Sequence, residues 1–584
     1  MENLKDMLSE SAEIYADNCA FLLKSEKGNY ETLSYKEYKQ EVDALGTELL
    51  YLGLKDSNIS IMSENRYEWC VAYLAVACGV GRVVPFDKEL TANEVSQLVN
   101  FCGARALFFS PKLFDKAIDI FKNSKSIEYG FVFDSDDKKN STLDEMQEKL
   151  AKLQIKVELF SFSKLIEQGK QKILENHDKS YINCQVKPDD TAAILFTSGT
   201  TGNPKGVMLS HFNICSNSTG VCKTVMMYPS DRTLCILPLH HTYQCTIGFL
   251  GFIYNGCSIA FCEGLKYISK NLKETSPTVL VAVPLLLENI YNKIIDQASK
   301  KTAGRVALSL FMKTSSLLML LGIDVRKKIF KKIHDNFGGQ LRLIISGAAA
   351  IDPKISKAFR VFGFDVLQGY GLTECSPLVA GNRDKLFKDD SVGFAIPGME
   401  VDIFEPNDEG IGEIIVKGCS VMQGYYKNAE ATNACIKNGW FHTGDLGRVD
   451  KKGFLYITGR CKNMILGKNG KNIYPEELEE YINRSPYVLE SMVWGEEDEK
   501  TGEPRVKVQI FPNMEAIGER LKAVNVTKEE LMKIFNELIK NVNKNLPSYK
   551  HIKEVVLRDK EFIKTSTKKI KRYLEHKNDK MATK

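Results

Sequence analysis

The sequence predicts an α/β protein with a large N-terminal domain of β/α subdomains, a small β-rich subdomain and a small α+β C-terminal domain. Three observations lead to this prediction. Helix-like and strand-like segments alternate through residues 1–190, as in parallel sheets covered by helices. From Val392 the chain changes to short strands separated by Gly, Pro and Asp turns. Residues 462–584 are basic and alternate again, and they have the size of a separate domain.

The elements follow from apolar spacing, taken in chain order. Residues 35–53 and 68–78 have the spacing of helices. Residues 134–148 are strongly charged, so we expect an exposed excursion there. Short apolar runs predict strands at residues 58–62, 83–86, 106–109, 192–196, 234–237, 280–283, 340–345 and 364–367. The β-rich subdomain is expected at residues 392–459, within an N-terminal domain of residues 1–461.

Length and composition indicate a globular protein of several units. At 584 residues the chain is too long for one core. Its net charge of +5 is small for this length, which argues against nucleic acid as the main partner. The 15 cysteines show no metal-binding spacing and many lie in apolar runs, which is typical of reduced cysteine in a cytoplasmic protein. We expect no signal peptide and no membrane-spanning helix.

The first chemical motif is residues 197–206, Thr-Ser-Gly-Thr-Thr-Gly-Asn-Pro-Lys-Gly, directly after an apolar strand. Its glycines let backbone N–H groups approach an anion, and its hydroxyls and Lys205 suit phosphate oxygens. The spacing is not that of a Walker A loop. Because Pro204 precedes the lysine and Gly206 follows it, we expect no helix to start at Lys205. The alternative is an ordinary surface loop.

The second motif is residues 368–377, Gln-Gly-Tyr-Gly-Leu-Thr-Glu-Cys-Ser-Pro. Glu374 stands where a dinucleotide fingerprint needs its third glycine, so a Rossmann interpretation is weak. Tyr370 between glycines could stack on a base. Thr373 could donate to a phosphate, and Glu374 could hold Mg²⁺ beside it. The alternative is a tight turn between a strand and a helix.

Three further motifs follow. Residues 439–447, Gly-Trp-Phe-His-Thr-Gly-Asp-Leu-Gly, place Asp445 in a glycine-bounded turn that suits the two hydroxyls of a ribose. Residues 458–477 form a basic, glycine-containing segment. Residues 564–572, Lys-Thr-Ser-Thr-Lys-Lys-Ile-Lys-Arg, lie close to the end of the chain. Taken alone, this last segment is typical of a solvated basic tail.

The five segments, in this order and spacing, resemble the adenylate-forming superfamily of acyl-CoA synthetases, luciferases and peptide-synthetase adenylation domains. Residues 237–243, 347–349, 368–374 and 469–477 are most similar to bacterial long-chain fatty acyl-CoA synthetases. The resemblance implies an N-terminal domain that binds AMP and the acyl group, and a mobile C-terminal domain of residues 462–584. It covers essentially the whole chain.

The implied activity is a two-step ligation that uses ATP, Mg²⁺ and coenzyme A. A long-chain fatty acid carboxylate attacks the α-phosphate of ATP, which releases pyrophosphate and leaves an acyl-adenylate. The thiol of coenzyme A then displaces AMP to give acyl-CoA. Alternatives within the family transfer the acyl group to a carrier protein, or activate an aryl or medium-chain acid. An alternative outside catalysis is a nucleotide-binding scaffold pseudoenzyme.

The resemblance also implies roles for individual residues. Lys569 would be the mobile lysine of adenylation, with Lys568 as a rival because the usual Thr-Gly-Lys reads Thr-Lys-Lys here. Lys462 would be the hinge, the alternative being a plain linker lysine. The phosphate-binding positions are Thr197, Ser198, Gly199, Thr200, Thr201, Gly202 and Lys205, with Thr200 and Glu374 at Mg²⁺ and Thr373 at the α-phosphate. Adenosine would be bound by Gly347, Ala348, Tyr370, Gly371, Asp445 and Arg460, and the acyl and coenzyme A groups by His240, His241, Gly369, Gly467 and Gly470.

Residues 307–323 are apolar but too short and too interrupted to span a bilayer. Basic clusters flank them on both sides, at residues 300–305 and 326–332. This pattern suits shallow insertion at an anionic membrane surface, and it places the expected protein in the cytoplasm or on the inner face of a membrane. The alternative is that the apolar side chains pack on the acyl pocket and the lysines are solvated.

Overall fold

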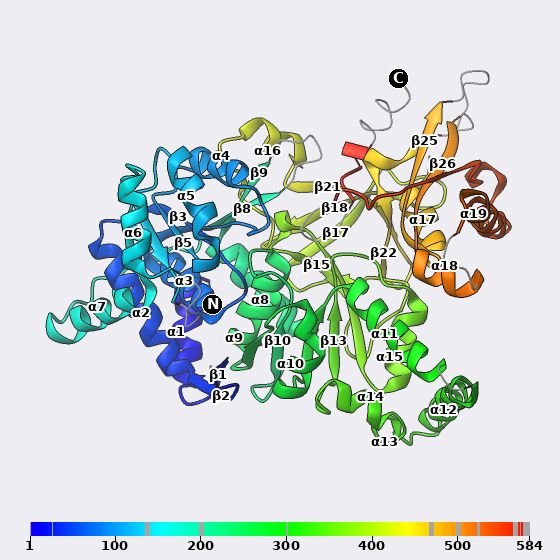
Figure 1. The fold of residues 1–584 in the computed structure, drawn as a ribbon, viewed down its shortest axis with the longest axis horizontal. Coiled ribbons are helices and arrows are strands. Elements are labelled where there is room, and N and C mark those ends of the chain that lie inside the picture. Colours follow the sequence, from blue (N-terminus) through cyan, green and yellow to red (C-terminus); the bar gives the residue numbers. More distant parts are fainter. Residues whose placement is uncertain are drawn as a thin grey trace. The chain divides into compact units, whose positions relative to one another are not determined.

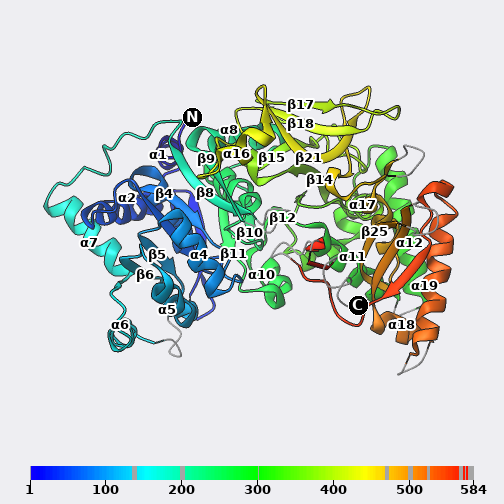
Figure 2. The ribbon, with the colours of Figure 1, turned by 90° about the horizontal axis from the view of Figure 1, so that it is seen from above.

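The computed structural model describes residues 2–25, 27–134, 141–197, 204–299, 302–466, 472–497, 504–521, 526–564, 570–572 and 574–575. Internal contacts divide the chain into two compact units. Unit 1 comprises the described residues within 1–197, 204–400 and 417–434, and unit 2 those within 401–416 and 435–584. Both units combine helices and strands (Figures 1 and 2).

The largest sheet of unit 1 has the strand order β19-β9-β8-β4-β3-β5-β6-β7. Its strands are β3 (Ser57–Met62), β4 (Gly81–Pro85), β5 (Ala106–Phe109), β6 (Tyr129–Val132), β7 (Glu158–Ser161), β8 (Thr191–Thr197), β9 (Lys205–Ser210) and β19 (Gly424–Tyr425). The strands from β8 to β7 pair in parallel, whereas β9 and β19 are antiparallel. Because the parallel strands are covered on both faces, they read in the sequence as continuous apolar runs.

Helices cover both faces of this sheet. They are α2 (Tyr35–Tyr51), α3 (Tyr67–Ala75), α4 (Ala92–Cys102), α5 (Phe114–Asn123), α6 (Leu143–Lys152) and α7 (Phe162–Glu175). In Figure 1, α4 and α5 lie above β3 and β5, and α2, α3 and α7 lie below them. One core joins strand residues such as Leu107 and Phe109 to Val95 and Val99 of α4. The expected excursion at residues 134–148 is wrong in part, because Met146 of α6 is buried in this core.

The other two sheets of unit 1 have the orders β10-β11-β1-β2 and β12-β13-β14-β15-β16. Their strands are β1 (Cys19–Lys24), β2 (Tyr30–Ser34), β10 (Arg232–Cys235), β11 (Ser258–Phe261), β12 (Val279–Ala282), β13 (Leu343–Ser346), β14 (Asp365–Gly371), β15 (Leu378–Gly381) and β16 (Phe394–Ala395). Strands β12, β13 and β14 run in parallel, so their carboxyl ends meet at one edge.

The remaining helices of unit 1 surround these sheets. They are α1 (Leu4–Ile14), α8 (His211–Thr224), α9 (Gly251–Tyr254), α10 (Ile268–Thr275), α11 (Pro284–Ser299), α12 (Thr302–Leu320), α13 (Arg326–Ile329), α14 (Lys331–Asn336), α15 (Pro353–Phe362) and α16 (Ala429–Cys435). Among the described residues, no helix combines the length and apolar character needed to cross a bilayer. Of four cysteines expected in buried apolar runs, Cys70, Cys78 and Cys235 are buried free thiols, whereas Cys262 is half-buried.

Unit 2 contains a β-rich part and an α+β part. The first sheet is built from β17 (Met399–Phe404), β18 (Gly412–Gly418), β20 (Ile436–Lys437), β21 (Trp440–Val449) and β22 (Leu455–Arg460). The other strands are β23 (Ile465–Leu466), β24 (Asn472–Ile473), β25 (Val488–Glu497), β26 (Pro504–Pro512) and β27 (Glu554–Leu557). Helices α17 (Pro475–Asn483), α18 (Met514–Leu521) and α19 (Lys528–Asn543) contribute to a core with β25, β26 and β27.

Candidate active site

Three side chains from separate elements of unit 1 meet beside the glycine-rich segment. Thr197 ends β8 and pairs with Lys205, which begins β9. The expectation that no helix starts at Lys205 is therefore confirmed. Lys205 Nζ lies 4.6 Å from the centre of the Tyr425 ring, a cation–π contact. Tyr425 Oη donates to Glu374 Oε1 at 3.0 Å. A lysine and a carboxylate are thus both held by one buried tyrosine.

Glu374 belongs to a short 3₁₀ turn, η5 (Thr373–Cys375), that follows β14. Its backbone carbonyl accepts from Met422 N at 2.8 Å, which ties the turn to the segment leading into β19. Both Thr373 and Glu374 are half-buried. The turn therefore has a fixed backbone and places two polar side chains where they remain accessible to a ligand.

The glycines before this turn are required by packing. Strand β14 runs on through Gly369, Tyr370 and Gly371, which pair antiparallel with β15. A Cβ on Gly371 would lie 2.1 Å from Pro377 O, a backbone atom that cannot give way. Tyr370 is half-buried. Residues 369–371 therefore still belong to the strand, and the turn begins only at Thr373.

Residues 347 and 348 follow β13 at the same sheet edge. Ser346 of β13 pairs with Gln368 of β14. Gly347 and Gly369 are the residues that directly follow this pair in the chain. Ala348 has a φ of +71°, a left-handed conformation that is uncommon for a residue with a side chain. Such conformations cluster at functional sites. Ligands of open parallel sheets bind at the carboxyl ends of the strands, which is where these residues lie.

A tyrosine that sequence reasoning did not single out supports this edge. Tyr243 Oη donates to Ile345 O at 2.9 Å and to Ala282 O at 3.1 Å, so it joins the ends of β13 and β12. A Cβ on Gly347 would lie 2.9 Å from the Tyr243 ring. Burial raises the pKa of Tyr243 far above its ordinary value, so the phenol remains a donor.

The two histidines lie in the loop after β10. His240 Nε2 is 3.1 Å from His241 Nε2 and 3.7 Å from Asp87 Oδ2. Burial and the neighbouring His241 lower the pKa of His240, and Asp87 opposes the shift only in part. His240 is therefore neutral at neutral pH. Asn65 fixes the loop, since it donates to Leu237 O and accepts from Leu239 N.

The next segment, Tyr243–Leu250, is a π-helix, a rare element that is frequent at functional sites. Its Gln244 is buried, and within the described part of the chain neither amide atom of its side chain has a hydrogen-bond partner. A buried unsatisfied amide costs about 1–3 kcal/mol. The side chain lies over Gly248, where an added Cβ would be 2.2 Å from Gln244 Nε2. Sequence reasoning missed both features.

In unit 2, the aspartate and arginine of the third and fourth motifs meet across two strands. Asp445 of β21 pairs with Arg460 of β22, and Arg460 Nε lies 3.0 Å from Asp445 Oδ1. Asp445 is buried, whereas Arg460 is exposed. The predicted turn around Asp445 is wrong, because the residue lies within β21 at an irregularity in the pairing.

Two residues hold the backbone before Asp445. Glu413 of β18 accepts from His442 Nδ1 at 2.8 Å through one oxygen and from Gly444 N at 2.9 Å through the other. Thr443 Oγ1 donates to Ile414 O and accepts from Asp445 N. Gly444 has a φ of +71°, which glycine adopts without strain. Glu413 therefore fixes the conformation that presents Asp445, and sequence reasoning missed it.

Several predicted residues lie outside the described part of the chain. They are Ser198, Gly199, Thr200, Thr201, Gly202, Gly467, Gly470, Lys569 and its rival Lys568. Lys462 is described and exposed, in the 3₁₀ turn η6 (Cys461–Asn463) directly after β22. The next residue, Asn463, donates to Glu476 Oε1 of α17.

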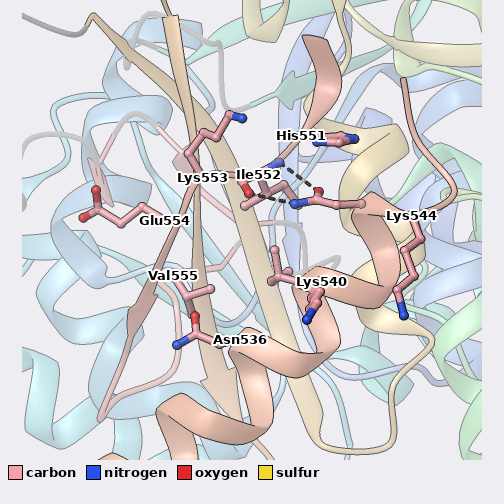
Figure 3. A pocket seen from close by; sticks show the side chains of 10 residues that line it. Asn536, Lys540, Lys544, His551, Ile552, Lys553, Glu554 and Val555 are labelled. Carbon is pink, nitrogen blue, oxygen red and sulfur yellow. Dashed lines mark hydrogen bonds between the residues drawn. The ribbon is translucent and has the colours of Figure 1, made fainter. Parts of the chain in front are cut away.

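A separate pocket of about 430 Å³ lies in unit 2 between α19 and residues 551–555 (Figure 3). Asn543 and Ile552 join its two walls by a pair of hydrogen bonds. Its lining includes Lys540, Lys544 and Lys553. No predicted site residue from the described part of the chain lines this pocket, so it is distinct from the candidate site.

The order of the motifs has a counterpart among known proteins. Residues 8–426 match the family described as AMP-binding enzyme, and residues 462–578 match the AMP-binding enzyme C-terminal domain. The chain belongs to the AMP-binding enzyme family. The predicted resemblance to the adenylate-forming superfamily is thereby confirmed.

Relatives of this AMP-binding enzyme match it over most of their length. Fatty acyl-CoA synthetase B of Dictyostelium discoideum is 28% identical over 614 residues, which cover 98% of this chain and 88% of the relative. The chloroplastic long-chain-fatty-acid–acyl-carrier-protein ligase AEE15 of Arabidopsis thaliana is 29% identical over 600 residues, covering 92% and 79%. Long-chain-fatty-acid–CoA ligase 1 of Homo sapiens is 31% identical over 507 residues, covering 80% and 68%.

A solved structure confirms the fold of this AMP-binding enzyme. The anthranilate CoA ligase AuaEII in complex with anthranoyl-AMP matches with a TM-score of 0.75 and 19% identity, covering 100% of this chain and 98% of the other. The predicted α/β class, with a large N-terminal and a small C-terminal domain, is therefore confirmed. The mobility of the C-terminal domain stays a prediction.

Proposed function

We propose that the protein joins a long-chain fatty acid to coenzyme A in two steps, with ATP as the energy source and AMP and pyrophosphate as products. One geometric observation carries the proposal. Lys205, Tyr425 and Glu374 meet through a cation–π contact and a hydrogen bond although their motifs are far apart in the sequence. Relatives named fatty acyl-CoA synthetases, similar along most of the chain, support the same reaction.

In the first step, the carboxylate of the acid attacks the α-phosphorus of ATP, the new C–O–P linkage forms, and pyrophosphate leaves. Negative charge spreads over the phosphate oxygens during this step. The charge of Lys205, a donated hydrogen bond from Thr373 and the proposed approach of Lys569 would stabilise it. Asp445, with Arg460 beside it, would bind the ribose hydroxyls, and Tyr370 would stack on the adenine above Gly347 and Ala348.

The residues also fit a magnesium ion. Glu374 supplies the carboxylate oxygens that Mg²⁺ prefers, and Tyr425 Oη donates to one of the two, Oε1. Thr200 is the other proposed ligand. When bound, Mg²⁺ would neutralise charge on the phosphate oxygens. Tyr425 would orient the carboxylate, since its hydroxyl donates to one oxygen and its ring packs on Lys205.

In the second step, the thiol of coenzyme A adds to the acyl carbonyl of the adenylate and AMP leaves, which gives the thioester. Gly369, Gly467 and Gly470 are the proposed positions beside the thiol. His240 and His241 would form part of the wall of the acyl pocket, and the lowered pKa of His240, which keeps that ring neutral, suits an apolar chain.

A carrier protein is the alternative acceptor, because the relative AEE15 is named a ligase of that class. ATP-pyrophosphate exchange across short, medium, long and aryl acids tests the first step. Thioester formation with coenzyme A and with phosphopantetheinylated carrier protein then identifies the acceptor. We expect exchange with long-chain acids and product with coenzyme A. ATP binding without any exchange would instead indicate a scaffold pseudoenzyme.

Glu413→Gln is expected to raise the KM for ATP about tenfold while the KM for the fatty acid stays unchanged. An amide has only one oxygen, so it cannot accept from His442 and Gly444 at both positions. Losing one hydrogen bond to a charged group costs about 1.5–3 kcal/mol, which corresponds to about tenfold or more. Steady-state kinetics with each substrate varied in turn measures the split. The exposed Glu409→Gln is the matched control. An equal rise in both KM values would show that Glu413 supports only the general stability of unit 2.

Lys462→Pro is expected to spare adenylation and to slow the thioester step at least about tenfold, since a hinge must absorb a large φ/ψ change. Proline fixes φ near about −65° and restricts Cys461 before it. Single-turnover assays of each half-reaction measure the effect, and Lys462→Ala, which keeps the backbone free, is the control. Wild-type rates in both half-reactions of the proline variant would place the hinge elsewhere.

We further propose that the protein acts in the cytoplasm at a membrane surface. Long-chain fatty acids partition into membranes, so a protein that takes them from there shortens their route to the acyl pocket.

A further inference from the structure

Helix α12 carries apolar side chains on two opposite faces. Its inner face packs on the core beneath β12 and β13 through Leu308 and Met312. Ser315 is buried on the same face and donates to Val361 O of α15. Positions 308, 312 and 315 follow one line along a helix, at intervals of four and three residues. This face explains how α12 is attached to unit 1.

The apolar side chains on the opposite face of α12 are not explained by packing on this core. Positions 306, 310, 313, 317 and 320 also follow one line, about half a turn away from the inner face. Four of these five residues are large and apolar, and we call them the outer stripe. Its members and their exposed fractions are Val306 (69%), Leu310 (60%), Leu317 (60%) and Leu320 (84%).

The outer stripe extends beyond the end of the helix. Leu321 and Ile323 are also exposed, at 68% and 50%. A surface helix of a globular protein normally turns charged residues to the solvent. Contiguous exposed apolar surface of this kind marks an interaction site. Figure 1 shows α12 in dark green at the edge of its unit, with α13 and α14 next to it.

Basic side chains on the next two helices, α13 and α14, determine which partner fits. Lys327 and Lys328 of α13 and Lys331 and Lys332 of α14 are exposed. Residues 300–332 contain nine basic residues and one acidic residue, a net charge of +8, whereas the whole chain carries +5. The single acid of this range, Asp324, binds Arg326 at 2.8 Å, and Asp335, just beyond it, binds Lys331 at 2.9 Å. The surface is therefore cationic as well as apolar.

We propose that the outer stripe of α12 and the lysines of α13 and α14 dock on an anionic membrane surface. Apolar side chains enter the boundary between headgroups and acyl chains while cations bind lipid headgroups, as in interfacial helices. Lys313 lies on the same line of the helix as the outer stripe and is exposed. Its long aliphatic stem lets it keep its charge at headgroup level.

A second copy of the chain fits this surface less well. A twofold contact through the outer stripe would use the same surface of both copies and bring the two cationic clusters together. The proposed function supplies the reason to dock, because a long-chain acid resides in the membrane. Vesicle binding can be measured without acid or ATP, so a failure of the docking proposal can be distinguished from a failure of the proposed function.

Cosedimentation of the full chain with vesicles tests the proposal. We expect the protein to pellet with phosphatidylglycerol vesicles at low salt, and to pellet far less with phosphatidylcholine vesicles or at high salt. Protein that stays in the supernatant with anionic vesicles at low salt would overturn the proposal. Equal binding to neutral and anionic vesicles would overturn the part assigned to the lysines.

Two sets of variants locate the surface. Replacing Leu310, Leu317 and Leu320 by serine is expected to weaken binding about tenfold or more, since each buried CH₂ contributes about 0.8 kcal/mol. Replacing Ile14, Leu174 and Leu265, which are as exposed elsewhere in unit 1, should leave binding unchanged. The charge set changes Lys327, Lys328, Lys331 and Lys332 to glutamine, and its control changes Lys122, Lys125, Lys149 and Lys152.

Two further measurements separate the outcomes. Sedimentation equilibrium without vesicles detects self-association, and a dimer that the leucine variant converts to a monomer would overturn membrane docking. Thermal unfolding followed by circular dichroism checks that each variant is folded. Loss of exchange in the wild type with retained vesicle binding would reject the proposed function and leave docking intact. Equal loss of binding in the variants and their controls would reject the assignment to α12.

Discussion

Lys569→Ala is expected to slow acyl-adenylate formation by about 10²–10³-fold, as the loss of one transition-state contact does elsewhere. Thioester formation from supplied acyl-adenylate should survive, because the proposed lysine is swung away in that step. Rapid-quench measurement of adenylate from acid and ATP tests the first statement. Product formation from synthetic acyl-adenylate and coenzyme A tests the second.

The described residues on either side anchor this segment to unit 2. Lys564 and Ile570 form an antiparallel bridge. Lys564 binds Glu490 and Glu561, and Arg572 binds Glu479 and donates to Val493 O. The chain before and after residues 565–569 thus belongs to the C-terminal core, so a single alanine at 569 should not unfold it.

Lys568→Ala is the matched control, one residue away and equal in charge. We expect both of its half-reactions to remain near wild type. If Lys568→Ala alone lost adenylation, the role would move to that residue. If Lys569→Ala slowed both half-reactions equally, the lysine would support binding or stability and not the adenylation step.

The sheets were largely predictable from the sequence. The strand expected at residues 106–109 is β5 (Ala106–Phe109), and that expected at 58–62 is β3 (Ser57–Met62). Strands buried on both faces of a parallel sheet need continuous apolar residues, and that pattern is readable without a structure. Lys205 was also placed correctly, because Pro204 before it and Gly206 after it disfavour a helix.

Features that depend on long-range pairing were not predictable. Tyr425 lies in a two-residue strand, and its place beside Lys205 depends on the pairing of β19 with β9. Glu413 reads as an ordinary strand residue until the register of β18 and β21 brings it to His442. The π-helix Tyr243–Leu250 is mostly apolar in sequence, and periodicity alone does not distinguish it from an α-helix.

Glu374→Gln is expected to lower adenylation about 10²–10³-fold and to shift the Mg²⁺ dependence to higher concentration. Glutamine keeps the size of the side chain and an oxygen that can accept from Tyr425 Oη. The substitution therefore removes the charge and leaves the packing. Activity measured over a series of Mg²⁺ concentrations separates weaker metal binding from a structural defect. A merely structural defect would lower the activity at saturating Mg²⁺ without moving the midpoint.

Tyr425→Phe tests how much the orientation of the Glu374 carboxylate contributes to adenylation, separately from its charge. Phenylalanine keeps a ring beneath Lys205 and removes the hydroxyl that donates to Glu374 Oε1. Losing one hydrogen bond to a charged group costs about 1.5–3 kcal/mol, so we expect the rate of adenylation to fall at least about tenfold. The Mg²⁺ midpoint should move in the same direction as in Glu374→Gln. Glu430→Gln, an exposed carboxylate on α16, is the control for charge alone. An unchanged Mg²⁺ midpoint in both Glu374→Gln and Tyr425→Phe would mean that the metal is held by other residues, and that the buried tyrosine serves only to pack β19 against β9.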